Sequence, residues 1–167
     1  PVNGGTAVLA GASNTASGST TVNSGATLRL SYGTNDNRKI SSGALTLSSG
    51  TIELAGGTFS DSVASTTLTA STSSTITQSS GTATLNLNAI TRNSGAFLNF
   101  AQSGIAKTSN ANNAFGILGT WATIGASNWA VNDGSGLIVA ATTTDITRLG
   151  ASASTIANGS TSHVRIT

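Results

Sequence analysis

Small apolar residues recur at short, regular intervals along most of the chain. Residues 41–61 divide into three consecutive seven-residue units, SSGALTL, SSGTIEL and AGGTFSD. Leu45 and Leu47 lie two positions apart, as do Ile52 and Leu54, which is the spacing of one face of a β-strand. A coiled coil also repeats every seven residues, but its apolar positions lie three and four apart, and glycine and threonine disfavour helix. The pattern therefore predicts short strands joined by tight corners.

The same unit recurs elsewhere in the chain, at residues 19–30 (STTVNSGATLRL), 81–87 (GTATLNL) and 95–100 (GAFLNF). A strand of four or five residues with a small-residue corner, repeated about three times, makes a coil of roughly 20 residues, the repeat length of a β-solenoid. We therefore expect an all-β fold, a three-sided parallel β-helix of about eight coils stacked about 4.8 Å apart. The crossover rule for parallel strands predicts right-handed winding.

The rhythm changes after residue 100. Residues 1–100 read as regular coils, and the asparagine-rich stretch 101–115 reads as a loop insertion at one corner. Residues 116–167 then read as the aromatic-containing and terminal coils of the same solenoid segment. Because the tail still alternates like a strand and the first residue is Pro1, we expect a piece of a longer array or a subunit that stacks end to end.

Composition excludes several classes of protein. The chain has 167 residues, of which 7% are charged and none is cysteine, so a disulfide framework and a cysteine nucleophile are excluded. The formal net charge is +2, and the basic residues are scattered rather than gathered in the dense stripe that phosphate binding requires. No apolar run is long enough to span a bilayer. We therefore expect no nucleic-acid partner and no membrane insertion by this segment.

Three stretches carry a family resemblance. Residues 20–30 (TTVNSGATLRL) resemble the core of the autotransporter-associated β-strand repeat. Residues 89–95 (AITRNSG) and 116–140 (GILGTWATIGASNWAVNDGSGLIVA) are similar to units of long bacterial surface proteins of that type. The resemblance implies a right-handed parallel β-helix in a secreted or surface-displayed passenger of structural or adhesive use. It also implies an extracellular or bacterial cell-surface location.

A catalytic role finds little support among the ionisable residues. Parallel β-helices host polysaccharide lyases and glycosidases, and glycoside hydrolysis uses two carboxylates close together. Glu53 and Asp61 fall on different faces of a three-sided coil, and His163 has no acid near it in sequence. We therefore predict no catalytic residue, no cofactor and no enzyme activity, and keep a polysaccharide-active enzyme as the third hypothesis. The acids considered are Asp36, Glu53, Asp61, Asp133 and Asp145.

Two short stretches offer oxygen ligands that could hold Ca²⁺, centred on Asp36 and Asp133. Neither has the spacing of an EF-hand or of a calcium-binding β-helix repeat. Aspartate and asparagine also bond their own backbone in Asx turns, and we favour that interpretation at both positions.

The remaining candidates for binding are aromatic and amide side chains. Trp121 and Trp129 could form a stacking platform for sugar rings, or could pack over the edge of a coil, which we favour. The amides of the predicted loop add polar groups beside them, from Asn110, Asn112 and Asn113. The leading hypothesis is a non-catalytic structural segment whose partners are adjoining repeats or copies of itself end to end. The alternative is an adhesin or glycan-binding module that uses these five residues.

Overall fold

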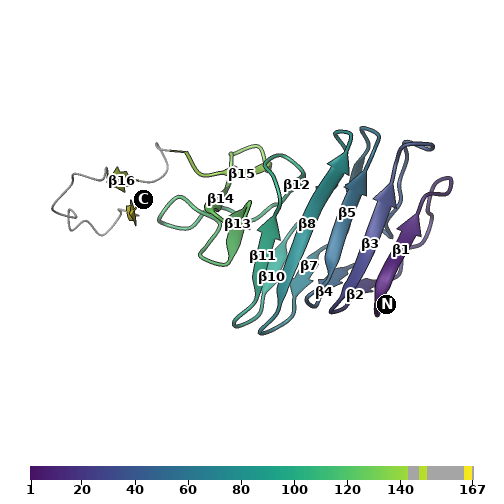
Figure 1. Ribbon diagram of the computed structural model, residues 1–167, viewed down its shortest axis with the longest axis horizontal. Coiled ribbons are helices and arrows are strands. Elements are labelled where there is room, and N and C mark those ends of the chain that lie inside the picture. Colours follow the sequence, from purple (N-terminus) through teal and green to yellow (C-terminus); the bar gives the residue numbers. More distant parts are fainter. Residues whose placement is uncertain (143–146, 150–163, 167) are drawn as a thin grey trace.

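Every regular element in the computed structural model, which describes residues 1–142, 147–149 and 164–166, is a β-strand. The strands of residues 1–142 stack as successive coils of a β-solenoid, which confirms the predicted fold class (Figure 1). The largest sheet has eight strands, in spatial order β1 (Gly5–Leu9), β3 (Ala26–Ser31), β5 (Thr51–Ala55), β8 (Ser73–Ser80), β11 (Phe97–Phe100), β13 (Ala122–Ile124), β14 (Asn128–Asn132) and β15 (Ile138–Ala140).

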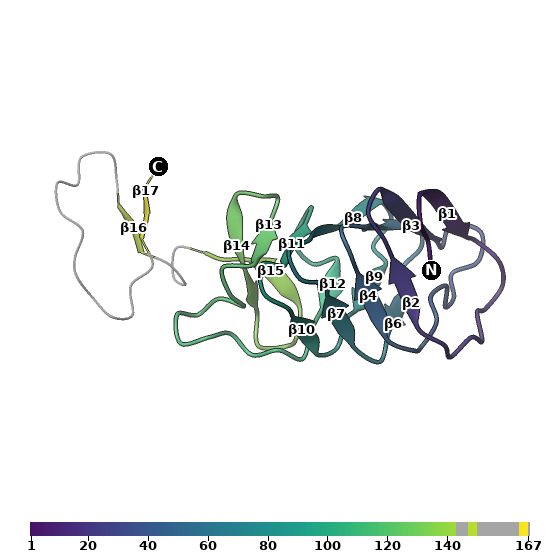
Figure 2. The ribbon, with the colours of Figure 1, turned by 90° about the horizontal axis from the view of Figure 1, so that it is seen from below.

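Two smaller parallel sheets form the other sides of the solenoid. The second sheet runs along the rod in Figure 2 and consists of β2 (Thr20–Val22), β4 (Leu45–Leu47), β7 (Thr66–Leu68) and β10 (Ile90–Arg92). The third consists of β6 (Ser60–Ser62), β9 (Thr84–Asn86) and β12 (Ala106–Lys107). A separate parallel pair joins β16 (Thr147–Leu149) and β17 (Val164–Ile166).

The register of the sheets gives the length of one coil. Thr51 lies opposite Thr27 on one side and Thr75 on the other, 24 residues away in each direction. Leu45 lies opposite Thr20 and Thr66, which are 25 and 21 residues away. Each coil is therefore slightly longer than the predicted 20 residues, and the parallel run from β1 to β13 contains five steps rather than about eight coils. The right-handed winding stays a prediction.

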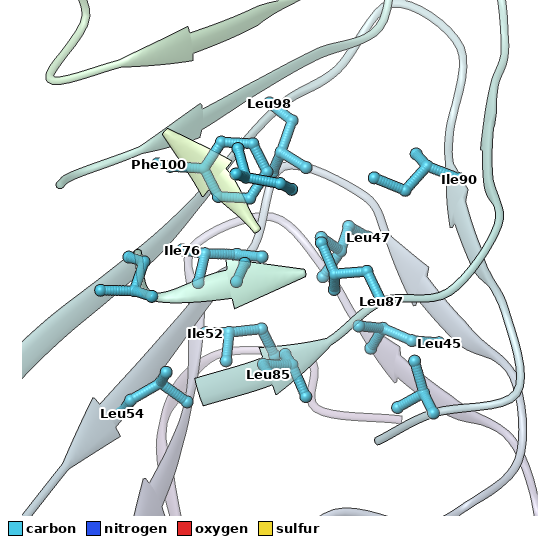
Figure 3. Packing of buried hydrophobic residues seen from close by; sticks show 14 of the residues in the cluster. Leu45, Leu47, Ile52, Leu54, Ile76, Leu85, Leu87, Ile90, Leu98 and Phe100 are labelled. Atoms are coloured by element: carbon cyan, nitrogen blue, oxygen red, sulfur yellow. The ribbon is translucent and has the colours of Figure 1, made fainter. Parts of the chain in front are cut away.

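Inward-facing side chains form columns along the solenoid axis. One column of the first sheet stacks Ala7, Leu28, Ile52, Ile76, Phe100 and Ile124. Side chains of the second and third sheets meet this column in a single core, as Figure 3 shows for Leu47 and Leu87. The strand alternation arises because every second residue faces this narrow interior and its neighbours face outward.

The corner that leads into the first sheet repeats a left-handed residue in successive coils. Gly25, Ser49, Ser71 and Gly95 have φ angles of 72°, 60°, 57° and 71°. This conformation costs glycine little, whereas serine adopts it at a small energetic cost. The repeated glycines of the sequence therefore mark turns of the coil, as the pattern predicted.

The structure after residue 100 differs in detail from the expected organisation. The strand β12 lies within residues 101–115, for which the sequence predicts a loop, and its Ala106 is buried in the core. Beyond β13, the chain does not continue as parallel coils: β14 pairs antiparallel with β13, and β15 pairs antiparallel with β14. Because alternation with a period of two is common to both arrangements, the sequence pattern did not distinguish them.

Candidate functional site

The two tryptophans belong to different apolar clusters. Trp121 is partly buried and packs against the main core, where its indole lies so close to Gly119 that an added Cβ would clash with Nε1. Trp129 lies in β14 and packs with Ile117 and Val131 in a second, smaller cluster. The contacts of both side chains therefore match the packing role that we favoured for them.

Two asparagines of the predicted loop use their side chains as extensions of the sheets. Asn110 Oδ1 accepts a hydrogen bond from Ile90 N at 2.7 Å, and Asn110 Nδ2 donates to Ile90 O at 3.0 Å. Asn112 makes the same pair of bonds with the backbone of Asn132, at 2.8 Å each. Each amide therefore saturates a backbone donor and acceptor of a neighbouring coil, which is a structural task.

Asn113 closes a local turn. Its Oδ1 accepts hydrogen bonds from Phe115 N at 2.9 Å and Ile117 N at 3.3 Å, and its own N–H donates to Ile117 O at 2.7 Å. The structure thus brings Asn112 against β14 but does not gather the three asparagines and two tryptophans into one polar cleft among the described residues.

Asp36 and Asp133 both accept bonds from nearby backbone and hydroxyl groups. Asp36 accepts from Thr58 Oγ1 at 2.6 Å and from Thr58 N at 2.9 Å, and these bonds hold the pKa of its carboxyl below the usual range. Asp133 accepts from Ser135 Oγ and Ser135 N, both at 2.8 Å, which likewise lowers its pKa. Only Asp133 forms the local turn that we expected, since Thr58 belongs to the next coil. In the part of the chain that the structure describes, no three His, Cys, Asp or Glu residues gather as a metal site.

The other predicted acids also have separate surroundings. Glu53 faces outward on β5, where its carboxylate lies 3.7 Å from Arg29 on the neighbouring strand. Such an exposed pair contributes little stability. Asp145 and His163 lie outside the described residues.

Asp61 anchors a buried polar cluster that the sequence did not identify. It occupies an inward position of β6, in register with Leu85 of β9, and is 1% exposed. Its Oδ2 accepts hydrogen bonds from Lys39 N at 2.7 Å, Ile40 N at 3.0 Å and the Tyr32 hydroxyl at 3.2 Å. The carboxylate therefore takes the place of a strand, since it satisfies the backbone of the irregular segment that lies above β6.

The same cluster buries a lysine and a tyrosine. Lys39 is 2% exposed, and its Nζ donates to Gly11 O at 2.6 Å and to Asn37 Oδ1 at 2.5 Å. Burial, followed by the negative charge of Asp61, raises the pKa of the Tyr32 phenol well above its ordinary value. The tyrosine therefore stays neutral and donates to the carboxylate. These contacts tie the first coils together and leave no group poised for acid–base chemistry.

The C-terminal end of the solenoid is covered by the β14–β15 hairpin. One face of the hairpin places Ala130 and Ile138 in the main core, where they are 0% and 1% exposed. The free edge of β15 is bonded as well, because Gly104 N donates to Ile138 O and Ala140 N donates to Ser103 Oγ, both at 2.9 Å. This closed end leaves neither an apolar cross-section nor an unpaired edge on β15.

The N-terminal end has no such cover. β1 is the outer strand of the eight-stranded sheet and pairs with β3 on one side. Its inward residues Ala7 and Leu9, together with Val2, pack against the core but stay partly exposed, and the outward Val8 is 54% exposed. We call β1 with these side chains the open edge. A strand edge without a charged side chain or proline invites pairing with another strand.

The open edge is the strongest candidate for a functional site in the described residues. Sequence reasoning missed its residues because Gly5–Leu9 reads as one more strand, and nothing local shows which strand lacks a neighbour. The two shallow hollows of the surface, each about 430 Å³, adjoin the same end, and the first is lined in part by Val8, Leu9 and Lys39.

Comparison with known proteins adds no identification. No protein-family model, curated protein or solved structure matches the chain. None of the described residues forms a helix of the length and apolar character needed to cross a membrane.

Proposed function

We propose that this chain is a non-catalytic structural segment of an extracellular or cell-surface β-solenoid. Its role is to extend a rod, and the open edge is where the next coil packs. The observation that carries the proposal is the partial exposure of the inward-facing Ala7 and Leu9, whose column partners Leu28 and Leu30 are 2% and 0% exposed.

Continuation of the existing ladders explains how the next coil would bind. A parallel strand beside β1 would extend the first sheet and place an apolar residue on Ala7, as Leu28 does on the other side. Covering the exposed parts of Val2, Ala7 and Leu9 would stabilise the contact by on the order of a few kcal/mol. The shared chemistry is that of a β-coil with small aliphatic inward residues.

The closed end narrows the ways in which copies could assemble. A head-to-tail filament of parallel coils needs an open edge at both ends, and here β15 lies antiparallel and is bonded on both sides. The proposal therefore favours growth at the open edge, by an adjoining coil or by the same edge of a second copy. The adhesin hypothesis receives less support, because the indoles and amides on which it depended are engaged in packing and backbone bonds.

Two adjacent substitutions test the proposal, since Val8 and Leu9 face opposite sides of β1. We expect the chain to self-associate with increasing concentration in sedimentation velocity, because the open edge is uncovered. Leu9→Lys should abolish this association by placing a charge in the interior column. Val8→Lys changes only the outward surface and serves as the matched control.

The outcomes separate clearly. Association that Leu9→Lys abolishes and Val8→Lys preserves supports the proposed role of the edge. A parent chain that sediments as a monomer at all concentrations contradicts it, as does association that both variants retain. Far-ultraviolet circular dichroism must show the same β-structure in all three proteins.

A further inference from the structure

The outward face of the second sheet is a regular array of small polar side chains. At one register position, β2, β4, β7 and β10 each present a threonine, and their ladder pairs Thr21, Thr46, Thr67 and Thr91. Two residues further along each strand, backbone bonds continue the ladder and place a second column of Asn23, Ser48, Thr69 and Asn93. We call these eight residues the Thr face.

The backbone fixes the spacing of the Thr face in two dimensions. Neighbouring rungs of a parallel sheet lie about 4.8 Å apart, and residues two apart along a strand lie roughly 6.6 Å apart. Threonine is stiff about χ1, so its hydroxyl and methyl groups hold their positions with little entropy to lose on binding. The face is therefore a preformed, flat lattice of hydroxyl, amide and methyl groups.

The hydroxyl groups of this lattice are available. Among the described residues, none of the six Thr face hydroxyls has a hydrogen-bond partner, whereas the hydroxyls of Thr58, Thr66 and Thr108 all bond within the protein. The amide of Asn23 does bond, to Asn3 Oδ1 at 2.7 Å, at the end of the array. Most of the polar groups thus point to whatever lies outside the sheet.

β-propensity alone does not account for this uniformity. The outward face of the first sheet has the same strand geometry yet carries Arg29, Glu53 and the 49% exposed Phe97. The scaffold therefore tolerates charge and aromatic rings on its outer surface. Neither column of the Thr face contains either kind of residue, and Arg92 nearby occupies an inward register of β10 and donates to Ala96 O at 3.0 Å.

The chemistry of the face excludes most partners. It lacks the cations that phosphate groups require and the aromatic or arginine anchors that dominate protein interfaces. It lacks aromatic rings on which sugars could stack, and the hollows of the surface lie elsewhere. A partner must be flat, uncharged, capable of donating and accepting hydrogen bonds, and periodic over several rungs.

We propose that the Thr face binds the surface of ice. Ordered water in a crystal plane repeats over distances similar to those between the columns and rungs, and it offers donors and acceptors in a fixed array. Each rung then orders water in the same way as its neighbour, so that the four rungs act together. The proposal is independent of the role of the open edge, since the two surfaces share no residue.

Inhibition of ice recrystallisation tests the proposal with the chain as it is. The parent protein should slow the growth of ice grains in a frozen sucrose solution and should partition into a slowly growing ice hemisphere. Thr67→Tyr and Thr46→Tyr each place a ring in the middle of the array, and we expect both effects to fall to the level of a non-binding control protein. Tyrosine has high β-propensity, so the variants should fold, as thermal unfolding will verify.

A matched substitution on the other sheet identifies the face responsible. Thr75→Tyr makes the same change at an outward position of β8, opposite Thr51, and should leave the activity unchanged. The proposal is overturned if the parent protein does not differ from the non-binding control, if Thr67→Tyr retains full activity, or if Thr75→Tyr loses it equally. Retention on crystalline cellulose or chitin without any effect on ice would also overturn it, in favour of a polysaccharide.

Discussion

The two ends of the described solenoid differ in how the apolar interior is covered. At the C-terminal end, the chain reverses and the β14–β15 hairpin places Ile138 over the core at 1% exposure. At the N-terminal end, β1 is the outer strand, and its inward Leu9 is only partly buried. The same repeat therefore ends once by closure and once by an edge that resembles the middle of the rod.

This difference shows that stacking a coil and ending a stack are separate structural tasks. Any coil can be followed by another of the same pattern, because inward residues meet in columns and backbone groups pair in register. Ending the stack requires side chains that substitute for the next strand. At the closed end, Asn110 and Asn112 satisfy backbone groups of Ile90 and Asn132.

The largest expected effect comes from the same kind of substitution at each end. Ile138→Asp buries an unpaired carboxylate under the hairpin and should reduce the free energy of unfolding by about 4 kcal/mol. Leu9→Asp places its carboxylate where water still reaches it and should cost about 1 kcal/mol. Urea denaturation followed by circular dichroism measures both. Equal losses at the two positions would remove the distinction between a closed and an open end.

The buried cluster around Asp61 should give the next largest effect. Asp61→Ala leaves Lys39 N, Ile40 N and the Tyr32 hydroxyl without their acceptor, and should cost about 3 kcal/mol. Because this cluster ties the first coils together, amide exchange should rise mainly in β1, β3 and the intervening segments. Exchange that rises equally in β14 and β15 would indicate one cooperative unit and would contradict a separately held N-terminal end.

The smallest effect concerns pH. The pKa values of Asp36 and Asp133 are lowered in the folded state, so ionisation of both carboxylates contributes stability above their unfolded pKa of about 4. That contribution is lost as pH falls below about 4 and through the folded pKa values.

Replacing both carboxylates should weaken this acid dependence. Asn keeps an acceptor oxygen without a titrating charge, so Asp36→Asn with Asp133→Asn should flatten the decline of Tm between neutral and acidic pH. Because Asp36 lies near the open end and Asp133 in the hairpin, each single variant reports on one end. Parallel Tm curves for the parent and the double variant would contradict the assignment.

The sequence predicted the solenoid because its signal is local. Leu45 and Leu47 lie two apart beside glycine corners, and that spacing alone places them on the inner face of a strand. The hairpin also left a signal, since Asp133 and Gly134 stand between alternating apolar residues that pair as Val131 with Val139. The pattern could not decide between antiparallel reversal and another parallel coil.

The candidate site was less accessible to sequence reasoning. Asp61 bonds to groups 21 to 29 residues away, and the alternation of β6 gives no hint of them. Leu9 has the same pattern as Leu30 and Leu54, and differs from them only because no strand lies beyond it. Both features depend on long-range arrangement, which one sequence does not encode in its local pattern.

Hydrogen–deuterium exchange at several protein concentrations tests the central claim most directly. If the open edge is the surface on which further coils pack, self-association should increase the protection of residues 5–9 and leave residues 138–140 unchanged. Protection that grows over residues 138–140 instead, or over neither segment while the chain associates, would contradict the account.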